Sequence, residues 1–385
     1  MADALFAPAN DFSANLFSSL SAGDTNVILS PISILSTLYL LLYGSAGSSK
    51  TNIAKTLRIP SKSGQDEEKI NLAYEKFQSF KKEFKNREPT FQINENIFVR
   101  QDRQIKPSAS FEGKFQLTKV NFEESKETAK KINDWVSTST GGLIQNIIDA
   151  GSISPDTILQ ILNTVYFKGA WEKEFDENKI KDETFKNFNN QEATVDMLIS
   201  ADNKLHAYYK SKSNIKAQIV ELPYLNSNLS MLVVLPDQGV AINDFIKQLP
   251  KIQGSLLKTE TSESKVEFMM PKFKFDNDLS LNEVLIQMGM GELFIEANLS
   301  KMLIYNAETQ PIQISDITHA AVIEVDEKGT TAAAATKIQV VSYSFIQNPQ
   351  FICNRPFMFY IIDRNTRLPL FTGVVKNLPD KYATF

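Results

Sequence analysis

Histidine and cysteine supply many catalytic and metal-binding groups in proteins, and this chain of 385 residues has two histidines and one cysteine. Its two histidines are His206 and His319, so a Ser-His-Asp triad would have to use one of them. Neither G-x-S-x-G nor H-E-x-x-H occurs, and His319 stands in an apolar segment that favours a hydrogen-bonded core histidine. These features argue against an enzyme.

Metal and nucleotide chemistry find equally little support. Cys353 is the only cysteine, which excludes an intramolecular disulfide and a thiolate cluster, and two histidines exclude a multi-histidine metal site. No Walker-type loop occurs, and the glycines of residues 288–294 (MGMGELF) lack the third glycine of a dinucleotide fingerprint. We therefore expect no metal and no cofactor.

The segment after Glu324 is unusual for a connection between strands. From Thr330 to Phe345 it contains no Gly, Pro or Asn, although ordinary loops use these residues to turn. In an extended chain, alternate residues share a face. One face would carry uncharged residues, small at its start: Thr330, Ala332, Ala334, Thr336, Ile338, Val340 and Ser342. The other face carries Lys337 and Gln339.

This alternation is typical of a half-buried strand, and small leading residues would let it enter between two strands already in place. An Ala-rich loop or a short helix is the alternative interpretation of the same segment.

The elements that would position such a strand indicate one α+β domain. Residues 11–20, 31–43 and 66–88 have the apolar spacing of helices, and Thr90–Val99 alternates like a strand before a further helical block at 132–148. Runs typical of strands dominate the second half. Because no linker interrupts the chain, we expect a single domain over residues 1–385 with large, mainly antiparallel or mixed sheets.

Composition and charge limit the classes of molecule that this protein could bind. The 41 basic and 45 acidic residues are mixed along the chain, so no charged field favours nucleic acid or a membrane. The apolar stretch from Ile32 to Tyr43 is too short to span a bilayer, and the N-terminus has no signal peptide. We expect a cytoplasmic protein, or a secreted one if the numbering begins at a mature form. The sequons at Asn228 and Asn298 matter only after secretion.

Several motifs resemble, in the same order, those of the serpin family. Besides the unusual segment, the resemblance lies in five blocks that fall between residues 11 and 378: NVILSPISILSTLYLLLYGSAGSSKTNIAKTL, ILNTVYFKGAWEKEF, VELPYLNSNLSMLVVLPD, VEFMMPKFKFDNDLSL and NRPFMFYIIDRNTRLPLFTGVV. The resemblance implies three β-sheets with about nine α-helices and an exposed reactive-centre loop at about residues 327–350.

The family resemblance also implies an activity. A protease attacks a bait bond in the loop and forms an acyl-enzyme, and the cleaved loop then inserts into the central sheet and distorts the tethered protease. The serpin supplies stored strain rather than catalysis, so the native state is kinetically trapped. The implied partner is a serine protease in a covalent complex, with a monomeric native state that forms polymers if destabilised.

Three regions follow from the match to the family. The hinge of the loop falls on Glu327, Lys328, Gly329, Thr330, Thr331, Ala332, Ala333, Ala334, Ala335 and Thr336. The shutter, a polar cluster beneath the sheet where its strands part, falls on Ser30, Ser33, Asn163 and His319. The breach, where insertion begins, falls on Trp171.

The bait residue follows from a count. Inhibitory serpins commonly have it fourteen positions after the hinge glycine Gly329, which gives Tyr343, with Ser344 on the leaving side. The stretch after Ser344 is longer than in typical members, so Phe345 is the alternative. Either aromatic residue suits a chymotrypsin-like or cathepsin G-like protease, whereas a cut at Lys337 would leave too short a segment to insert.

Two other functions stay open at this point: a non-inhibitory serpin acting as carrier, chaperone or storage protein, and an inhibitor of cysteine proteases. Non-inhibitory members usually have charged, bulky or proline residues in the hinge, and none occurs from Thr330 to Thr336. A polyanion site on Lys81, Lys82, Lys85 and Arg87 is not expected, because acidic residues alternate with them as on a solvated helix face.

Overall fold

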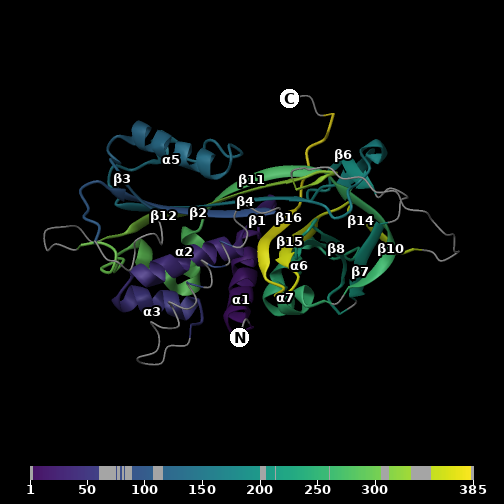
Figure 1. Cartoon of the computed structure of the whole chain (residues 1–385), viewed down its shortest axis with the longest axis horizontal. Helices are drawn as coiled ribbons and strands as arrows, with labels where there is room; N and C mark the ends of the chain where they lie inside the picture. The colour runs from purple at the N-terminus through teal and green to yellow at the C-terminus, as the bar shows by residue number, and fades with distance from the viewer. Residues whose placement is uncertain are drawn as a thin grey trace.

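The computed structural model describes residues 3–59, 89–106, 116–199, 205–212, 214–259, 261–304, 312–330 and 348–382, together with Glu75, Ser79 and Lys82. A large mixed sheet crosses the centre of the molecule (Figure 1). Its strands, in spatial order, are β11 (Phe273–Ser280), β12 (Ile314–Val325), β4 (Leu159–Ala170), β2 (Thr90–Arg100) and β3 (Gln116–Val120), and the short β13 (Gly329–Thr330) pairs with β4. The pairs β12–β4 and β2–β3 are parallel, and β11–β12 and β2–β4 are antiparallel.

Two further sheets share the long strand β10 (Ser262–Pro271). Its first half pairs with β7, and its second half pairs with β6 and β14. The first of these sheets contains β1 (Val27–Leu29), β16 (Pro369–Val375), β15 (Phe357–Asp363), β9 (Leu229–Pro236), β8 (Ala217–Pro223) and β7 (Leu205–Lys212). The second contains β6 (Glu192–Ile199), β5 (Lys181–Lys186) and β14 (Gln350–Ile352). The expected three sheets are therefore present.

Seven α-helices lie within the described residues, where about nine were expected for the whole chain. They are α1 (Asp3–Leu20), α2 (Pro31–Gly44), α3 (Gly47–Thr56), α5 (Ser125–Ser139), α6 (Ile242–Lys247), α7 (Leu249–Leu257) and α8 (Asn282–Leu285). The predicted helix at 66–88 lies almost wholly outside the described residues. The block predicted at 132–148 ends as a helix at Ser139, because Gly141 and Gly142 adopt positive φ angles of 62° and 82° that stop it. None of the described helices is long and apolar enough to cross a bilayer.

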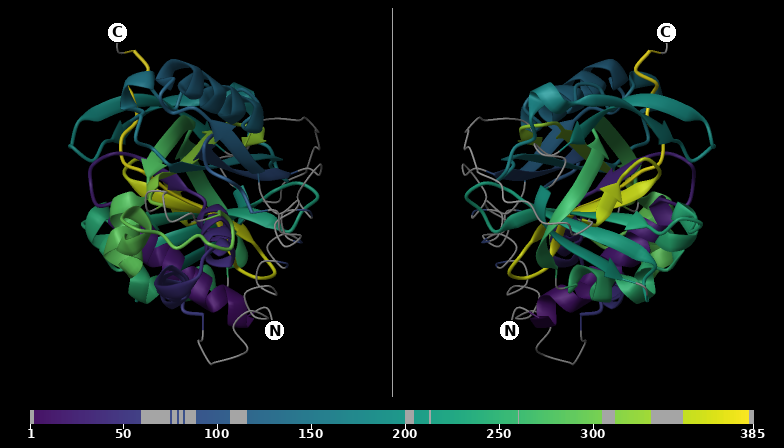
Figure 2. Two further views of the ribbon diagram at one scale, coloured as in Figure 1. Left: turned by 90° about the vertical axis from the view of Figure 1, so that its left-hand side faces the viewer. Right: turned by 90° about the vertical axis from the view of Figure 1, so that its right-hand side faces the viewer.

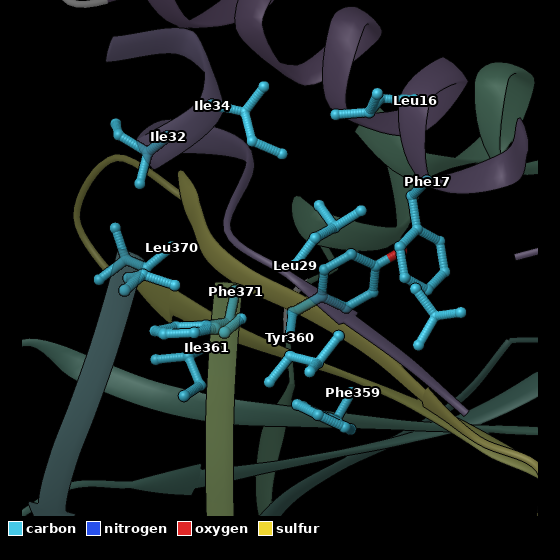
Figure 3. Close-up of a cluster of buried hydrophobic side chains, with 14 of the residues drawn as sticks. Leu16, Phe17, Leu29, Ile32, Ile34, Phe359, Tyr360, Ile361, Leu370 and Phe371 are labelled. Atoms are coloured by element: carbon cyan, nitrogen blue, oxygen red, sulfur yellow. The ribbon is translucent and has the colours of Figure 1, made fainter. Parts of the chain in front are cut away.

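The main core lies on one side of the central sheet and is built around α2. Ser30 caps this helix, since its Oγ accepts the Ser33 N–H at 3.3 Å, and Pro31 takes the first helical position. Side chains of α1 and α2 pack against those of β15 and β16, among them Ile34, Phe359 and Phe371 (Figure 3). Burial of each such side chain contributes roughly 1.5–3 kcal/mol, so α2 is fixed beneath the sheet.

A second, smaller core lies on the other side of the same sheet. Here α5 covers β2 and β4, and Ile132 and Val136 of the helix pack with Phe98 and Leu162 of the strands. Figure 2 shows α5 (blue) on the opposite side of the central sheet from the N-terminal helices (purple) in both end views. The sheet is therefore covered by helices on both faces, and its strands can part only if these contacts change.

Candidate functional site

The centre of the sheet contains a seam between two parallel strands. β12 pairs with β4 over residues 314–322 and 159–166, with His319 opposite Asn163. The hinge follows the end of β12 directly. Parallel strands pair less stably than antiparallel ones, and a strand inserted between β4 and β12 could pair antiparallel with both. The seam is therefore the place where an extra strand fits the sheet.

Two hinge residues, Gly329 and Thr330, pair with β4. After β12 the chain turns, and Asp326 N donates to Gly329 O at 2.9 Å. Gly329 then lies opposite Ala170 and Thr330 opposite Gly169, in an antiparallel bridge. The direction of this bridge is the one that an inserted strand would have.

Gly329 is required by this close approach. Its φ is +149°, and a Cβ atom on it would lie 2.2 Å from the carbonyl oxygen of Gly169. No side chain fits at that distance from the backbone of another strand. The glycine therefore lets the hinge contact β4.

Charged side chains hold the turn before the hinge. Asp326 Oδ1 accepts the N–H groups of Lys328 and Gly329 at 2.9 and 3.0 Å, and burial raises the pKa of this carboxyl above its ordinary value. Glu327 forms an ion pair with Lys272 at 2.7 Å. Burial opposes ionisation of Glu327, but the hydrogen bond and charge of Lys272 hold its pKa below the ordinary value. Lys328 pairs with Glu177 at the surface.

Trp171 lies at the breach and binds the same turn from the other side. Its indole Nε1 donates to Asp326 O at 3.0 Å, and its backbone N–H donates to Lys328 O at 3.0 Å. The buried ring stacks on Tyr224 with centroids 4.8 Å apart, and Phe175 contacts it edge-on at 6.3 Å. An aromatic cluster therefore holds the end of the seam that lies beside the hinge, where β4 ends.

The shutter residues meet at the middle of the seam. Ser30 caps α2, Ser33 lies in its first turn, and Asn163 and His319 project from β4 and β12. His319 Nδ1 donates to Asn163 Oδ1 at 2.7 Å, and its Nε2 accepts the Ser30 N–H at 3.0 Å. Ser33 Oγ donates to Asn163 Oδ1 at 2.6 Å. The four residues thus form one buried network that joins both strands to α2, with Ser30 bonded to His319 through its backbone N–H.

Two residues that the sequence analysis did not name complete this network. Asn163 Nδ2 donates to Ser33 O at 3.1 Å and to Thr37 Oγ1 at 3.0 Å. Thr37 Oγ1 in turn lies 3.5 Å from Glu95 Oε1 on β2. Thr37 follows Ser33 by one helical turn, so its position could have been inferred from helix periodicity. Glu95 could be placed only by the pairing of β2 with β4.

His319 is neutral in this environment. Burial lowers the pKa of its imidazole from the ordinary 6.5 to about 3, because no water reaches the ring to solvate a charge. Since Nε2 accepts a backbone N–H, the single ring proton lies on Nδ1. The prediction of a hydrogen-bonded core histidine agrees with this geometry, and the histidine acts here as a neutral bridge rather than a base.

The remaining predicted site residues lie outside the described part of the chain. They are Thr331, Ala332, Ala333, Ala334, Ala335, Thr336, Tyr343, Ser344 and Phe345. The breach residues beyond Trp171 were missed by the sequence analysis: Gly169, Tyr224, Lys272 and Asp326 carry no local signature of a site.

Comparisons with known proteins place this geometry in a family. Residues 7–378 match the family model Serpin (serine protease inhibitor). Serpin B8 of Bos taurus is 31% identical over 386 residues, covering 96% of this chain and 98% of that protein. The native structure of the thermophilic serpin tengpin superposes with a TM-score of 0.84 and 26% identity, covering 98% of this chain and 94% of that one.

The chain belongs to the serpin family. Human thyroxine-binding globulin, solved in complex with thyroxine, shares the fold with a TM-score of 0.85 at 23% identity, covering 98% of this chain and 100% of that one. Many serpins inhibit serine proteases and are not themselves enzymes, whereas some members are non-inhibitory. The predicted family and fold class are confirmed.

Proposed function

We propose that this serpin is a suicide inhibitor of chymotrypsin-like or cathepsin G-like serine proteases, with Tyr343 as bait. The observation that carries the proposal is the antiparallel bridge of Gly329 and Thr330 with the end of β4. A hinge that already pairs at the mouth of the seam can continue in the same register once the loop is cut.

Two registers support insertion between β4 and β12. In an antiparallel pair, the residue numbers of every two facing residues have the same sum, and this sum defines the register. The sum is 499 for the bridge with β4. It is 655 for the turn after β12, in which Asp326 bonds to Gly329. The two sums differ by 156, which is also the difference in number between His319 and its partner Asn163. One inserted strand can therefore pair with both neighbours without a shift.

The same register assigns the faces of the inserted strand. Partners in an antiparallel pair share a face, and the even-numbered loop positions match odd-numbered residues of β4 such as Asn163 and Val165, which face the main core. The even positions are the uncharged face found in the sequence, so no charge enters the main core during insertion.

Insertion in this register would carry the bait across the molecule. Val340 would lie opposite Leu159, where β4 begins, and Tyr343 would lie just beyond. The twelve residues of β4 span roughly 40 Å at about 3.3 Å per residue. A protease tethered to Tyr343 would therefore travel the length of the sheet.

The covalent step belongs to the protease. Its serine Oγ attacks the carbonyl carbon of Tyr343, the bond to the nitrogen of Ser344 breaks, and that nitrogen leaves as an amine with the proton taken from the serine. The serpin stays bound as an ester. Distortion of the protease after insertion would stop water from hydrolysing that ester.

A chymotrypsin and cathepsin G panel, read on denaturing gels, tests the proposal. We expect an SDS-stable complex and a released C-terminal peptide whose mass places the cut after Tyr343; a cut after Phe345 would move the bait without changing the mechanism. Thr330→Arg should abolish the complex while cleavage continues, because an arginine would face the main core. The matched Thr331→Arg variant, with the charge on the opposite face, should retain most of the complex.

The panel also separates the other functions. Cleavage without any complex would indicate a non-inhibitory serpin and would overturn the proposal. A complex with papain-like proteases and none with the serine proteases would assign the same mechanism to the cysteine class. Retention of the complex in Thr330→Arg would contradict insertion in the register described.

A further inference from the structure

The outer face of β12, on the side of the sheet that α5 covers, carries a half-buried carboxylate outside the shutter and the breach. Asp316 Oδ1 accepts a hydrogen bond from Ser280 Oγ of the neighbouring β11 at 2.6 Å, and Oδ2 accepts one from Thr318 Oγ1. Each carboxylate oxygen can accept a further hydrogen bond. Two hydroxyl groups therefore hold Asp316 in a fixed position on this face.

The register of the proposed insertion would place one charged residue of the loop near Asp316. Lys337 is the only charged residue from Thr330 to Phe345. In the register set by β13, position 337 lies opposite Leu162 of β4, and the turn after β12 places it opposite Thr318. Leu162 and Thr318 are already partners across the seam, so both registers agree on the location.

A lysine at this position would need a partner. Leu162 is fully buried beneath Ile132 and Val136 of α5, and Thr318 is 8% exposed. An ammonium group in such surroundings is costly unless it is paired or reaches water. Asp316 is two residues from Thr318 on the same face, at the distance of about 7–8 Å that separates diagonal neighbours and that a lysine side chain can span.

We propose that Asp316 is the docking point for the ammonium group of Lys337 when residues 331–341 of this chain occupy the seam. The inference rests on the proposed inhibitory function. The occupant is a named segment of the same chain, chosen by the coincidence of the two registers and by charge complementarity. Gln339 would lie directly opposite Asp316, and its side-chain amide would donate a further hydrogen bond to the same carboxylate.

Under this proposal the contact forms when residues 331–341 occupy the seam. β4 and β12 are now paired directly with each other at Leu162 and Thr318, so no strand lies between them at this row. A pair that forms only after insertion adds to the free energy that drives the loop into the sheet, without stabilising the native state. The ion pair is thus a specific source of driving force in this chain.

A double-mutant cycle between Asp316→Asn and Lys337→Gln tests the proposal. Asparagine keeps an acceptor for the Ser280 hydroxyl, so the native fold should be retained. Each variant is cleaved with chymotrypsin, and mass spectrometry checks that the cut follows Tyr343 or Phe345, so that residues 331–341 stay on the inserting segment. Guanidinium unfolding is then followed for the cleaved and uncleaved forms. We expect a coupling of about fivefold in the unfolding equilibrium constant of the cleaved form and additivity in the uncleaved form.

The matched control is Asp278→Asn, which removes an exposed carboxylate from β11 on the same face, one strand further from the seam. Paired with Lys337→Gln, it should show no coupling in either form. Additivity of Asp316→Asn and Lys337→Gln in a cleaved form that resists denaturant more than the uncleaved form would overturn this inference and leave the proposed function intact. If cleavage brings no gain in resistance, the loop does not insert, and the proposed function fails with it.

Discussion

The breach and the shutter hold the same seam by opposite physical means. At the breach the contacts are backbone bonds to one turn, an aromatic cluster around Trp171 and an ion pair between Glu327 and Lys272 that solvent partly reaches. At the shutter, Ser30, Ser33, Asn163 and His319 are buried and hydrogen-bonded to one another. Ser30 and Ser33 come from the start of α2, and the other two come from the strands.

The contrast indicates different roles for these two parts of the seam. Partly exposed ion pairs and the backbone hydrogen bonds of a turn can be replaced by bonds to water one at a time, and each replacement changes the free energy only slightly. A buried network loses more than the sum of its bonds when one member is removed, because its partners stay unsatisfied. We infer that the breach opens in steps and that the shutter resists as one unit, and four perturbations test this difference.

The largest effect is expected for Asn163→Ala at the shutter. Removal of the amide leaves Ser33, Thr37 and His319 without their buried partner, so the native state should lose roughly 3–5 kcal/mol. Urea unfolding measures the loss, and native gels should show polymers. Asn96→Ala on the outer face of the neighbouring strand removes only contacts to Thr118 and should cost about 1 kcal/mol. Equal losses in the two variants would contradict a cooperative shutter.

Gly329→Ala should have the next largest effect. The added Cβ would overlap the Gly169 carbonyl oxygen, so the hinge must leave β4, at a cost of about 2–3 kcal/mol. We expect more cleaved serpin and less trapped protease per encounter, read as a higher stoichiometry of inhibition. Gly239→Ala is the control, since Gly239 also has a positive φ, of +84°, but has open space around its Cβ position. An unchanged stoichiometry of inhibition in Gly329→Ala would show that inhibition does not require the bridge between the hinge and β4.

Acid should weaken the shutter through His319. The unfolded chain takes up a proton below pH 6.5, whereas the native imidazole, with its pKa of about 3, does not. Stability contributed by the neutral ring is therefore complete above pH 6.5 and falls as pH decreases, by up to about 1.4 kcal/mol per pH unit. The free energy of unfolding of the wild type and of His319→Asn, measured between pH 5 and 8, should differ in slope by this term. Parallel curves would show that the native ring takes up a proton as readily as the unfolded one, and so that burial does not lower the pKa of His319.

Glu327→Gln at the breach should have the smallest effect. It removes one ion pair that solvent partly reaches, so we expect a loss of about 1 kcal/mol and faster loop insertion after cleavage. Glu177→Gln, which breaks the exposed pair with Lys328, should change stability by less than about 0.5 kcal/mol. If Glu327→Gln destabilises as much as Asn163→Ala, the distinction between the two regions is wrong.

Local sequence patterns predicted much of the fold. The apolar helix beginning at Pro31 and the strand beginning at Thr90 follow from hydrophobic periodicity and the Ser30 cap, which are properties of neighbouring residues. The family motifs supplied the three sheets and identified Ser30, Ser33, Asn163, His319 and Trp171 as site residues. The end of α5 at Ser139 was misplaced, because the apolar pattern continues through residues that pack on the sheet without being helical.

The sequence by itself determined that the segment after Gly329 alternates as a strand would and has one small, uncharged face, since that pattern depends only on the order of neighbouring residues. Tertiary structure decided that Gly329 and Thr330 pair with β4 and that β4 and β12 lie side by side in their observed register. These strands are far apart in the chain, and their offset is set by packing on α2 and α5. For the same reason Glu95, Lys272 and Asp316 had no signal in the sequence. Their roles depend on strand partners that only the folded sheet brings together.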